Sequence, residues 1–124
     1  MEIKKLLPNY VDDRGEIIDI VINNNITSVT LITFKKNSIR ANHYHKETIQ
    51  WNLVLKGKIK LVTQIKDGDI VETILNKGML AKTLEYEKHA LKALEESEVL
   101  IITKGPRSGD QYILDTFPLD KKLI

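Results

Sequence analysis

Two of the three histidines of this 124-residue chain lie one residue apart, in the segment RANHYHKETIQWNLVLKG at residues 40–57. On a β-strand, alternate side chains point to the same face about 6.5–7 Å apart, so His43 and His45 can turn toward one centre. Two such imidazoles can bind one divalent cation through nitrogen bonds of about 2.1 Å. They can also act as a base and an orienting group against a substrate, because the pKa of imidazole lies near neutrality. The alternative is that both rings face solvent on a wet sheet.

The elements that must position these histidines have the pattern of short strands. β-branched and apolar runs are separated by Gly, Asn and Asp, and they occupy residues 16–22, 26–34, 49–55, 58–65, 70–75 and 98–103. Asp67-Gly68 lies between two alternating runs and predicts a hairpin, because Gly accepts the positive φ of a tight turn. Turns that recur every 8–12 residues predict an all-β fold, an antiparallel sandwich or barrel.

One segment, residues 84–97, has a different composition. It is rich in Ala, Leu, Glu and Lys, and Leu84, Leu91 and Leu94 share one face at helical spacing. Local propensity therefore predicts a helix that would carry the third histidine, His89. The family resemblance described below predicts a strand from residue 89 instead.

Composition limits the function classes. The length suits one domain, and 42% hydrophobic with 29% charged residues is typical of a globular protein. The net charge of +2, with lysines interspersed among acids, gives no support for binding nucleic acid or a membrane surface. The chain has no cysteine, which excludes disulfides and thiolate metal ligands. The segment MEIKKLLPNY has too short an apolar run for a signal peptide and no run could span a bilayer, so we expect a cytoplasmic protein.

The pattern around the histidine pair resembles the first motif of the cupin superfamily: Gly, five residues, His-x-His, three or four residues, Glu, six residues, Gly. Asn37 stands at the first Gly, Gln50 replaces Glu, and Gly57 falls at the closing Gly. The second cupin motif is Gly, five residues, Pro-x-Gly, two residues, His, three residues, Asn. Gly78 and His89 match it at the right spacing. All three histidines of the chain thus fall on the histidine positions of one family.

This resemblance implies a double-stranded β-helix, a small jelly-roll barrel with the site at its mouth. It covers about residues 12–117, which predicts a single cupin domain over residues 1–124, in which His89 begins a barrel strand.

The resemblance also implies that His43, His45 and His89 ligate a divalent transition metal, which the sequence leaves open among Fe, Mn, Ni, Cu and Zn. Gln50 would take the fourth ligand position with its amide oxygen, a weaker ligand than a carboxylate. No organic cofactor is expected.

A second resemblance concerns the segment RANHYHKETIQ. It is similar to the Arg-Gly-x-His-x-His-Lys-x-x-x-Gln pattern of the NDP-4-keto-6-deoxyhexose 3,4-ketoisomerases, which are metal-free cupins, with Ala in place of the Gly. DDRGE near the start is similar to a turn of the 3,5-epimerases, and the tail GDQYILDTF is similar to the Tyr-rich ending of related small cupins. This resemblance implies proton transfer beside a ketone, with His45 or His43 as base. Arg40 would bind a diphosphate or stabilise an enolate. Tyr112 is a candidate acid or a structural tyrosine.

The strand at residues 49–55 has two distinct faces. Gln50 and Asn52 share one face and are predicted to line the cavity and bind a small-molecule substrate. The opposite face carries Trp51 and is apolar, so we expect a second subunit to cover it in a homodimer. The leading prediction of function is isomerisation or epimerisation of a sugar or sugar nucleotide. A metal-dependent dioxygenase and a non-catalytic cupin that binds a metal or small ligand are the alternatives.

Overall fold

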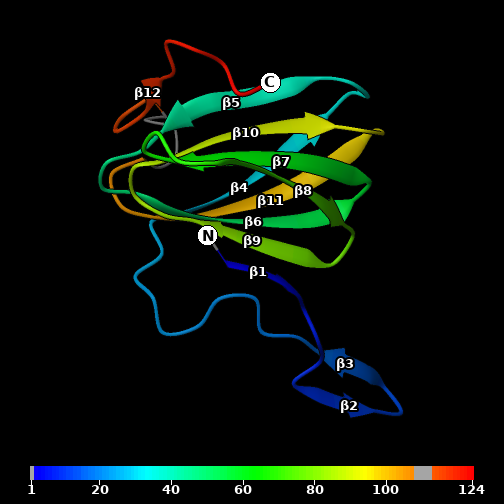
Figure 1. Ribbon diagram of the computed structural model, residues 1–124. Coiled ribbons are helices and arrows are strands. Elements are labelled where there is room, and N and C mark those ends of the chain that lie inside the picture. Colours follow the sequence, from blue (N-terminus) through cyan, green and yellow to red (C-terminus); the bar gives the residue numbers. More distant parts are fainter. Residues whose placement is uncertain (1, 108–112) are drawn as a thin grey trace.

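Two five-stranded antiparallel sheets face one another in the computed structural model, which describes residues 2–107 and 113–124 (Figure 1). The first sheet has the strand order β1-β9-β6-β11-β4 and the second has the order β12-β5-β10-β7-β8, while β2 and β3 form a separate hairpin. The described residues contain strands and no helix, so the all-β prediction is confirmed. Consequently, no helix that could cross a membrane occurs in this part of the chain.

The strand bounds define the two sheets. The first sheet consists of β1 (Glu2–Lys5), β9 (Met79–Thr83), β6 (Ile49–Lys56), β11 (Ser97–Lys104) and β4 (Ser28–Phe34). The second consists of β12 (Phe117–Pro118), β5 (Ile39–Tyr44), β10 (Glu87–Ala93), β7 (Lys58–Ile65) and β8 (Ile70–Asn76). The small hairpin is β2 (Tyr10–Asp12) and β3 (Gly15–Ile17).

The hydrophobic core lies between the two sheets. Ile59 and Leu61 of β7, Leu75 of β8, Val54 of β6 and Ile101 of β11 belong to one cluster of buried side chains. Burial of each such side chain stabilises the fold by about 1.5–3 kcal/mol relative to exposure.

The predicted hairpin at residues 67–68 is present, because β7 and β8 pair antiparallel on either side of it. The source of the turn differs from the prediction. The positive φ belongs to Lys66 (53°), and the amide of Gly68 donates to the carbonyl of Ile65 at 3.0 Å.

The segment that carries His89 is a strand, so the local helix prediction for residues 84–97 is wrong and the strand prediction is confirmed. β10 pairs with β5 on one side and with β7 on the other. Ala90, Leu91 and Ala93 are buried. Backbone pairing on both edges and this burial outweigh helix propensities that amount to a few tenths of a kcal/mol per residue.

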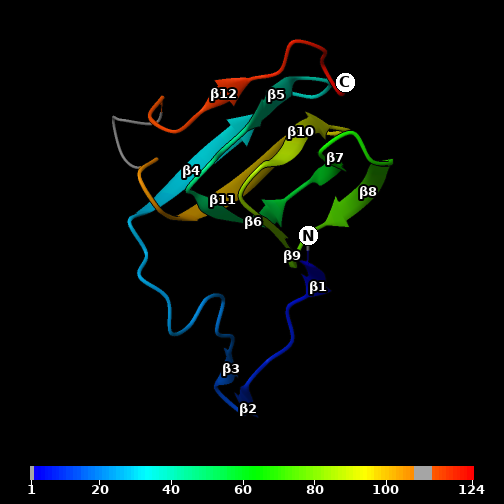
Figure 2. The ribbon, with the colours of Figure 1, turned by 60° about the vertical axis from the view of Figure 1, so that its left-hand side comes forward.

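The strand predicted at residues 16–22 is shorter in the structure, where β3 ends at Ile17. The β2–β3 hairpin projects from the barrel, and the chain that follows β3 leads back from it to β4 (Figures 1 and 2). A second buried cluster, which contains Trp51, lies on the outer face of the first sheet. Ile20 and Val21 pack against this cluster. Trp51 is 6% exposed, so the chain itself covers part of the apolar face that predicted a second subunit.

Candidate functional site

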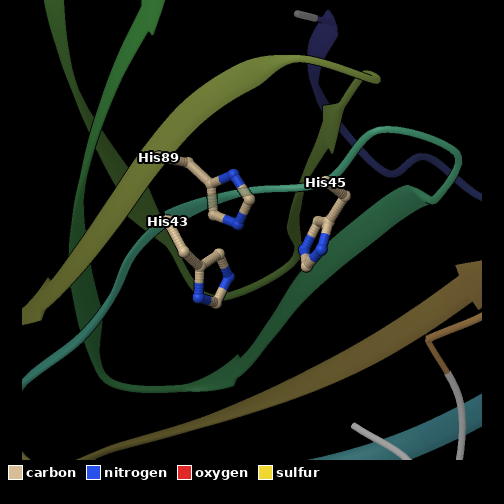
Figure 3. Close-up of side chains that lie close together, drawn as sticks. All are labelled: His43, His45 and His89. Carbon is tan, nitrogen blue, oxygen red and sulfur yellow. The ribbon is translucent and has the colours of Figure 1, made fainter. Parts of the chain in front are cut away.

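The rings of the three histidines lie close together (Figure 3). β5 and β10 are neighbours, and their register places His43 opposite His89. The ring centroids lie 4.6 Å apart for His43 and His89, 4.8 Å for His43 and His45, and 5.2 Å for His45 and His89. One ligand nitrogen from each ring lies within 4.8 Å of the others. The three side chains therefore form one cluster, as the motif spacing predicted.

A β-bulge aims the first of these histidines. The register between β5 and β10 passes from His43–His89 to Ala41–Ala90, which leaves Asn42 as an extra residue on β5. Ala41 and Asn42 have φ values of 74° and 55°, in the left-handed region. The carboxamide oxygen of Asn42 accepts a hydrogen bond from the amide of Leu123 at 2.8 Å. The C-terminal segment thus holds the bulge, and such bulges commonly redirect a side chain beside a functional site.

Hydrogen bonds fix the tautomers of the two most buried histidines. Nδ1 of His45 donates to the carbonyl of Asp115 at 2.8 Å, and Nδ1 of His89 donates to the carbonyl of Glu87 at 3.0 Å. A carbonyl only accepts, so each Nδ1 carries the proton and each Nε2 keeps a lone pair. Both Nε2 atoms are buried and form no hydrogen bond of normal geometry. An unpartnered buried acceptor lowers the stability of the fold by about 1–3 kcal/mol. Both atoms are therefore candidates to bind a ligand.

The cluster is uncharged at neutral pH. Burial, with a smaller contribution from the neighbouring histidines, lowers the pKa of His43 to about 2. Burial also lowers the pKa of His89 to about 4, against the opposing hydrogen bond to Glu87. The pKa of His45 is lowered by burial as well, although its bond to Asp115 opposes this. Neutral imidazole is the form that ligates a metal or accepts a proton.

Gln50 and Asn52 lie on the same face of β6 and are buried, as the alternation along this strand predicted. Two hydrogen bonds orient the side chain of Gln50. The side-chain amide of Asn52 donates to the carbonyl of Ala81 at 3.0 Å. Because that carbonyl cannot donate, Oδ1 of Asn52 faces Gln50 and accepts from its Nε2 at 2.7 Å. Oε1 of Gln50 therefore points away from Asn52. Gln50 approaches His45 closely enough to oppose the fall in its pKa.

Arg107 is a site residue that the sequence analysis missed. It follows the end of β11, the strand whose Thr103 pairs with Gln50. Its positive charge contributes to lowering the pKa of all three histidines, and its Nη1 atom is buried with no hydrogen-bond partner. A lone arginine in a loop gives no signal by itself. Only the pairing of β11 with β6 could have placed it beside the histidine cluster.

The structure does not bring Arg40 to the histidine cluster. Its side chain is exposed, its Nη2 donates to the carbonyl of Thr33 at 3.3 Å, and its guanidinium lies 5.4 Å from the centroid of the Phe34 ring. The register places Arg40 opposite Leu91, two residues along β10 from His89. Tyr112 and much of the tail segment that resembles the small cupins lie outside the described residues.

Comparison with known proteins identifies the family. Residues 10–116 match the family described as polysaccharide biosynthesis C-terminal domain. The chain belongs to this family. No curated protein matches the sequence.

Solved structures with the same fold include sugar-nucleotide enzymes. The WlaRB TDP-quinovose 3,4-ketoisomerase from Campylobacter jejuni aligns with a TM-score of 0.78 and 18% identity, over 94% of this chain and 90% of its own. A variant of the QdtA 3,4-ketoisomerase from Thermoanaerobacterium thermosaccharolyticum, in complex with TDP-4-keto-6-deoxyglucose, aligns with a TM-score of 0.74 and 20% identity, over 94% of this chain and 85% of its own. At these identities the likeness shows the fold, which is the jelly-roll barrel of the cupins, as predicted.

A larger protein also contains this fold. The capsular polysaccharide assembling protein CapF from Staphylococcus aureus aligns with a TM-score of 0.65 and 24% identity, over 94% of this chain and 33% of its own. The polysaccharide biosynthesis domain described here thus spans about a third of the length of CapF.

Proposed function

We propose that this domain isomerises or epimerises a sugar nucleotide by moving a proton on a carbon beside a carbonyl. The observation that carries the proposal is the pair of buried, unpartnered Nε2 atoms on His45 and His89. The ring of His43 packs against both of these histidines. A closed polar cluster of this kind suits proton transfer or carbonyl polarisation. The family description and the fold shared with 3,4-ketoisomerases support a sugar nucleotide as the substrate.

His43 is the histidine best placed to meet a substrate. It is less buried than the other two, and its ring forms no hydrogen bond with the described residues. In ketoisomerisation a base takes the proton from the carbon beside the carbonyl, and the electron pair moves onto the carbonyl oxygen. The proton of the hydroxyl on the first carbon then passes to that oxygen, and a proton returns to the former carbonyl carbon as the new carbonyl forms on the first carbon. His43 or His45 would act as the base in a metal-free site.

We also propose that the cluster binds a divalent transition metal, because the donor set fits one. Nε2 of His45, Nε2 of His89, one nitrogen of His43 and Oε1 of Gln50 would hold it, and two of these imidazoles carry the Nδ1–H···O=C bonds typical of metal-ligating histidines. When bound, such an ion supplies a Lewis acid for a carbonyl oxygen. A lone pair that ligates a cation cannot also accept a proton, so the metal-bound and metal-free sites would use different bases.

The test of the function is solvent exchange. The purified domain would be incubated with TDP-4-keto-6-deoxyglucose in deuterated water and followed by proton NMR. Deuterium should enter beside the carbonyl, and the His45→Asn variant should show at least a hundredfold slower exchange. Lys35→Asn, on the exposed turn after β4, is the control and should exchange like the wild type. Absence of exchange with TDP- and UDP-linked 4-keto sugars would contradict the proposal.

Metal analysis of protein purified without chelator separates the two forms of the site. One transition-metal ion per chain, lost in the His89→Asn variant, is the result expected for the metal site. Protein that holds no metal and still exchanges substrate protons would contradict the metal site and leave the histidine base.

A further inference from the structure

Arg107 is held beside the histidine cluster by its backbone. Its amide donates to Oγ1 of Thr48 at 3.3 Å, and its carbonyl accepts from Oγ1 of Thr103 at 3.1 Å. Thr48 and Thr103 are fully buried. The guanidinium therefore starts from an anchored backbone, and its buried Nη1 has an unused hydrogen-bonding capacity at the site.

No acidic side chain neutralises this charge among the described residues. The carboxylate of Asp115 accepts from the amides of Lys46 and Glu47 and from the hydroxyl of Thr48. Oε1 of Glu87 accepts from the amide of Leu84 at 3.0 Å. No ion pair joins Arg107 to an acid in the part of the chain that the structure describes.

Apart from Asp115, whose carboxylate acts on His45 and is held by the amides of Lys46 and Glu47, the described side chains of the site carry no negative charge. The three histidines are neutral, and Gln50 and Asn52 are amides. A half-buried guanidinium stays protonated at neutral pH, although burial lowers the pKa of Arg107. The site thus has a fixed positive charge whose natural counterpart is an anionic group of the ligand.

We infer that Arg107 binds an oxyanion of the substrate at the histidine cluster, and that this oxyanion is the enediolate formed during proton transfer. The identity of the oxyanion rests on the proposed function. When the base takes the proton from the carbon, the electron pair of that C–H bond forms the C=C bond and the carbonyl electrons move onto oxygen. Arg107 donates hydrogen bonds to that oxygen through its planar fork of N–H groups. The proton of the hydroxyl on the first carbon then passes to this oxygen, the base returns its proton to the former carbonyl carbon, and a carbonyl forms on the first carbon, which discharges the oxyanion.

The test uses glycolate as the probe, because its planar carboxylate beside a hydroxyl carbon has the charge and shape of an enediolate. Binding would be measured by calorimetry on protein as purified and on chelator-treated protein. Arg107→Met should weaken glycolate binding roughly 10- to 100-fold, the loss expected for a charge-assisted hydrogen bond. Arg107→Lys should restore part of it. Arg14→Met is the matched control, since Arg14 is exposed and pairs with Asp12, and it should bind like the wild type.

Kinetics supply the second readout. With the keto sugar, Arg107→Met should lower kcat at least tenfold and change KM less, because the uncharged ketone gains little from the guanidinium before the proton moves. Glycolate bound equally by the wild type and Arg107→Met, or not bound by the wild type at tens of millimolar, would overturn the inference. If glycolate binding depends on Arg107 while no keto sugar exchanges a proton, the oxyanion site stands and the proposed function fails. If Arg107→Met does not fold, the comparison of Arg107→Lys with the wild type decides.

Discussion

Nδ1 of His45 donates to the backbone carbonyl of Asp115 at 2.8 Å, although the two residues lie 70 positions apart in the chain. Asp115 also holds the turn that follows β5. Its carboxylate accepts hydrogen bonds from the amides of Lys46 and Glu47 and from the hydroxyl of Thr48. Burial by itself would raise the pKa of Asp115, but these hydrogen bonds hold it below its usual value. The C-terminal segment therefore sets the orientation of a site histidine.

Replacement of Asp115 should disturb the site from outside it. Asp115→Ala removes three accepted hydrogen bonds and should lower the free energy of unfolding by about 2–3 kcal/mol, measured by urea denaturation. It should also weaken metal binding or proton exchange roughly 10- to 100-fold, as loss of an orienting partner does. Asp115→Asn should do less harm, because Asn tolerates the φ of 54° and keeps one acceptor oxygen. Asp120→Ala, on the exposed tail, is the control, and an equal effect of both alanine variants would contradict this role.

Gln50→Glu tests whether Oε1 of Gln50 faces the ion-binding centre. A carboxylate there would compensate the charge of a divalent ion, so metal affinity should rise roughly tenfold, measured by competition with a chelator. The gain should be larger in a double variant with Asn52→Ser, because Oδ1 of Asn52 is fixed by Ala81 and would repel the new carboxylate. Gln64→Glu, whose amide donates to the carbonyl of Gly68, is the control. Unchanged affinity in Gln50→Glu would show that this oxygen is turned elsewhere.

The neutral histidines predict loss of stability in acid for the metal-free protein. The pKa values of His43, about 2, and His89, about 4, lie below the unfolded value of 6.5. Below pH 6.5 the unfolded chain takes up protons that the folded chain refuses, so the free energy of unfolding falls as the pH drops toward 4. Above pH 6.5 neither state is protonated at these positions and this contribution is flat. Urea denaturation of chelator-treated protein between pH 4 and 8 should show this slope, and His43→Asn with His89→Asn should reduce it.

Gly57 and Gly78 form a matched pair for backbone strain, because both have a positive φ, 89° and 85°. A Cβ at Gly78 would meet nothing within 4 Å, whereas a Cβ at Gly57 would overlap Oγ of Ser97 and the carbonyl oxygen of Glu96. Gly78→Ala should therefore cost only the strain of the left-handed region, about 1–2 kcal/mol. Gly57→Ala should cost that strain and a shift of the turn before β11, at least about 1 kcal/mol more. Thermal denaturation of both variants measures the difference, and equal losses would contradict it.

A homodimer remains a prediction, and its basis changes with the structure. Trp51 is covered within the chain, but Val29 and Leu31 on edge strand β4 are 60% and 56% exposed, and Leu7 and Ile17 are exposed near or on the projecting hairpin. An isolated two-stranded hairpin is marginally stable in water, so we expect a second copy to pack against the hairpin and against the exposed side chains of β4. Sedimentation should give a dimer that Leu31→Lys weakens at least tenfold. Glu72→Lys, on the other sheet, should leave it intact, and a monomer at all concentrations would contradict the prediction.

The alternating pattern of apolar and polar residues by itself determined the all-β class and the faces of the central strand. Period-two alternation puts Gln50 and Asn52 on one face of β6 and Trp51 on the other, because successive side chains of a strand point to opposite sides. Motif spacing joined His89 to His43 and His45 and outweighed a local helical composition. These are properties of short segments or of a spacing common to a family.

The tertiary structure alone decided which distant groups complete the site. Arg107 and Asp115 reach the histidines because β11 pairs with β6 and the C-terminal segment pairs with β5. Arg40 lies beside the histidines in the sequence, yet the bulge at Asn42 and the register opposite Leu91 turn it to Thr33 and Phe34. Local pattern fixes the side of a strand on which a residue lies, whereas the register between strands fixes which residue of another strand it meets. That register follows from packing of the whole barrel.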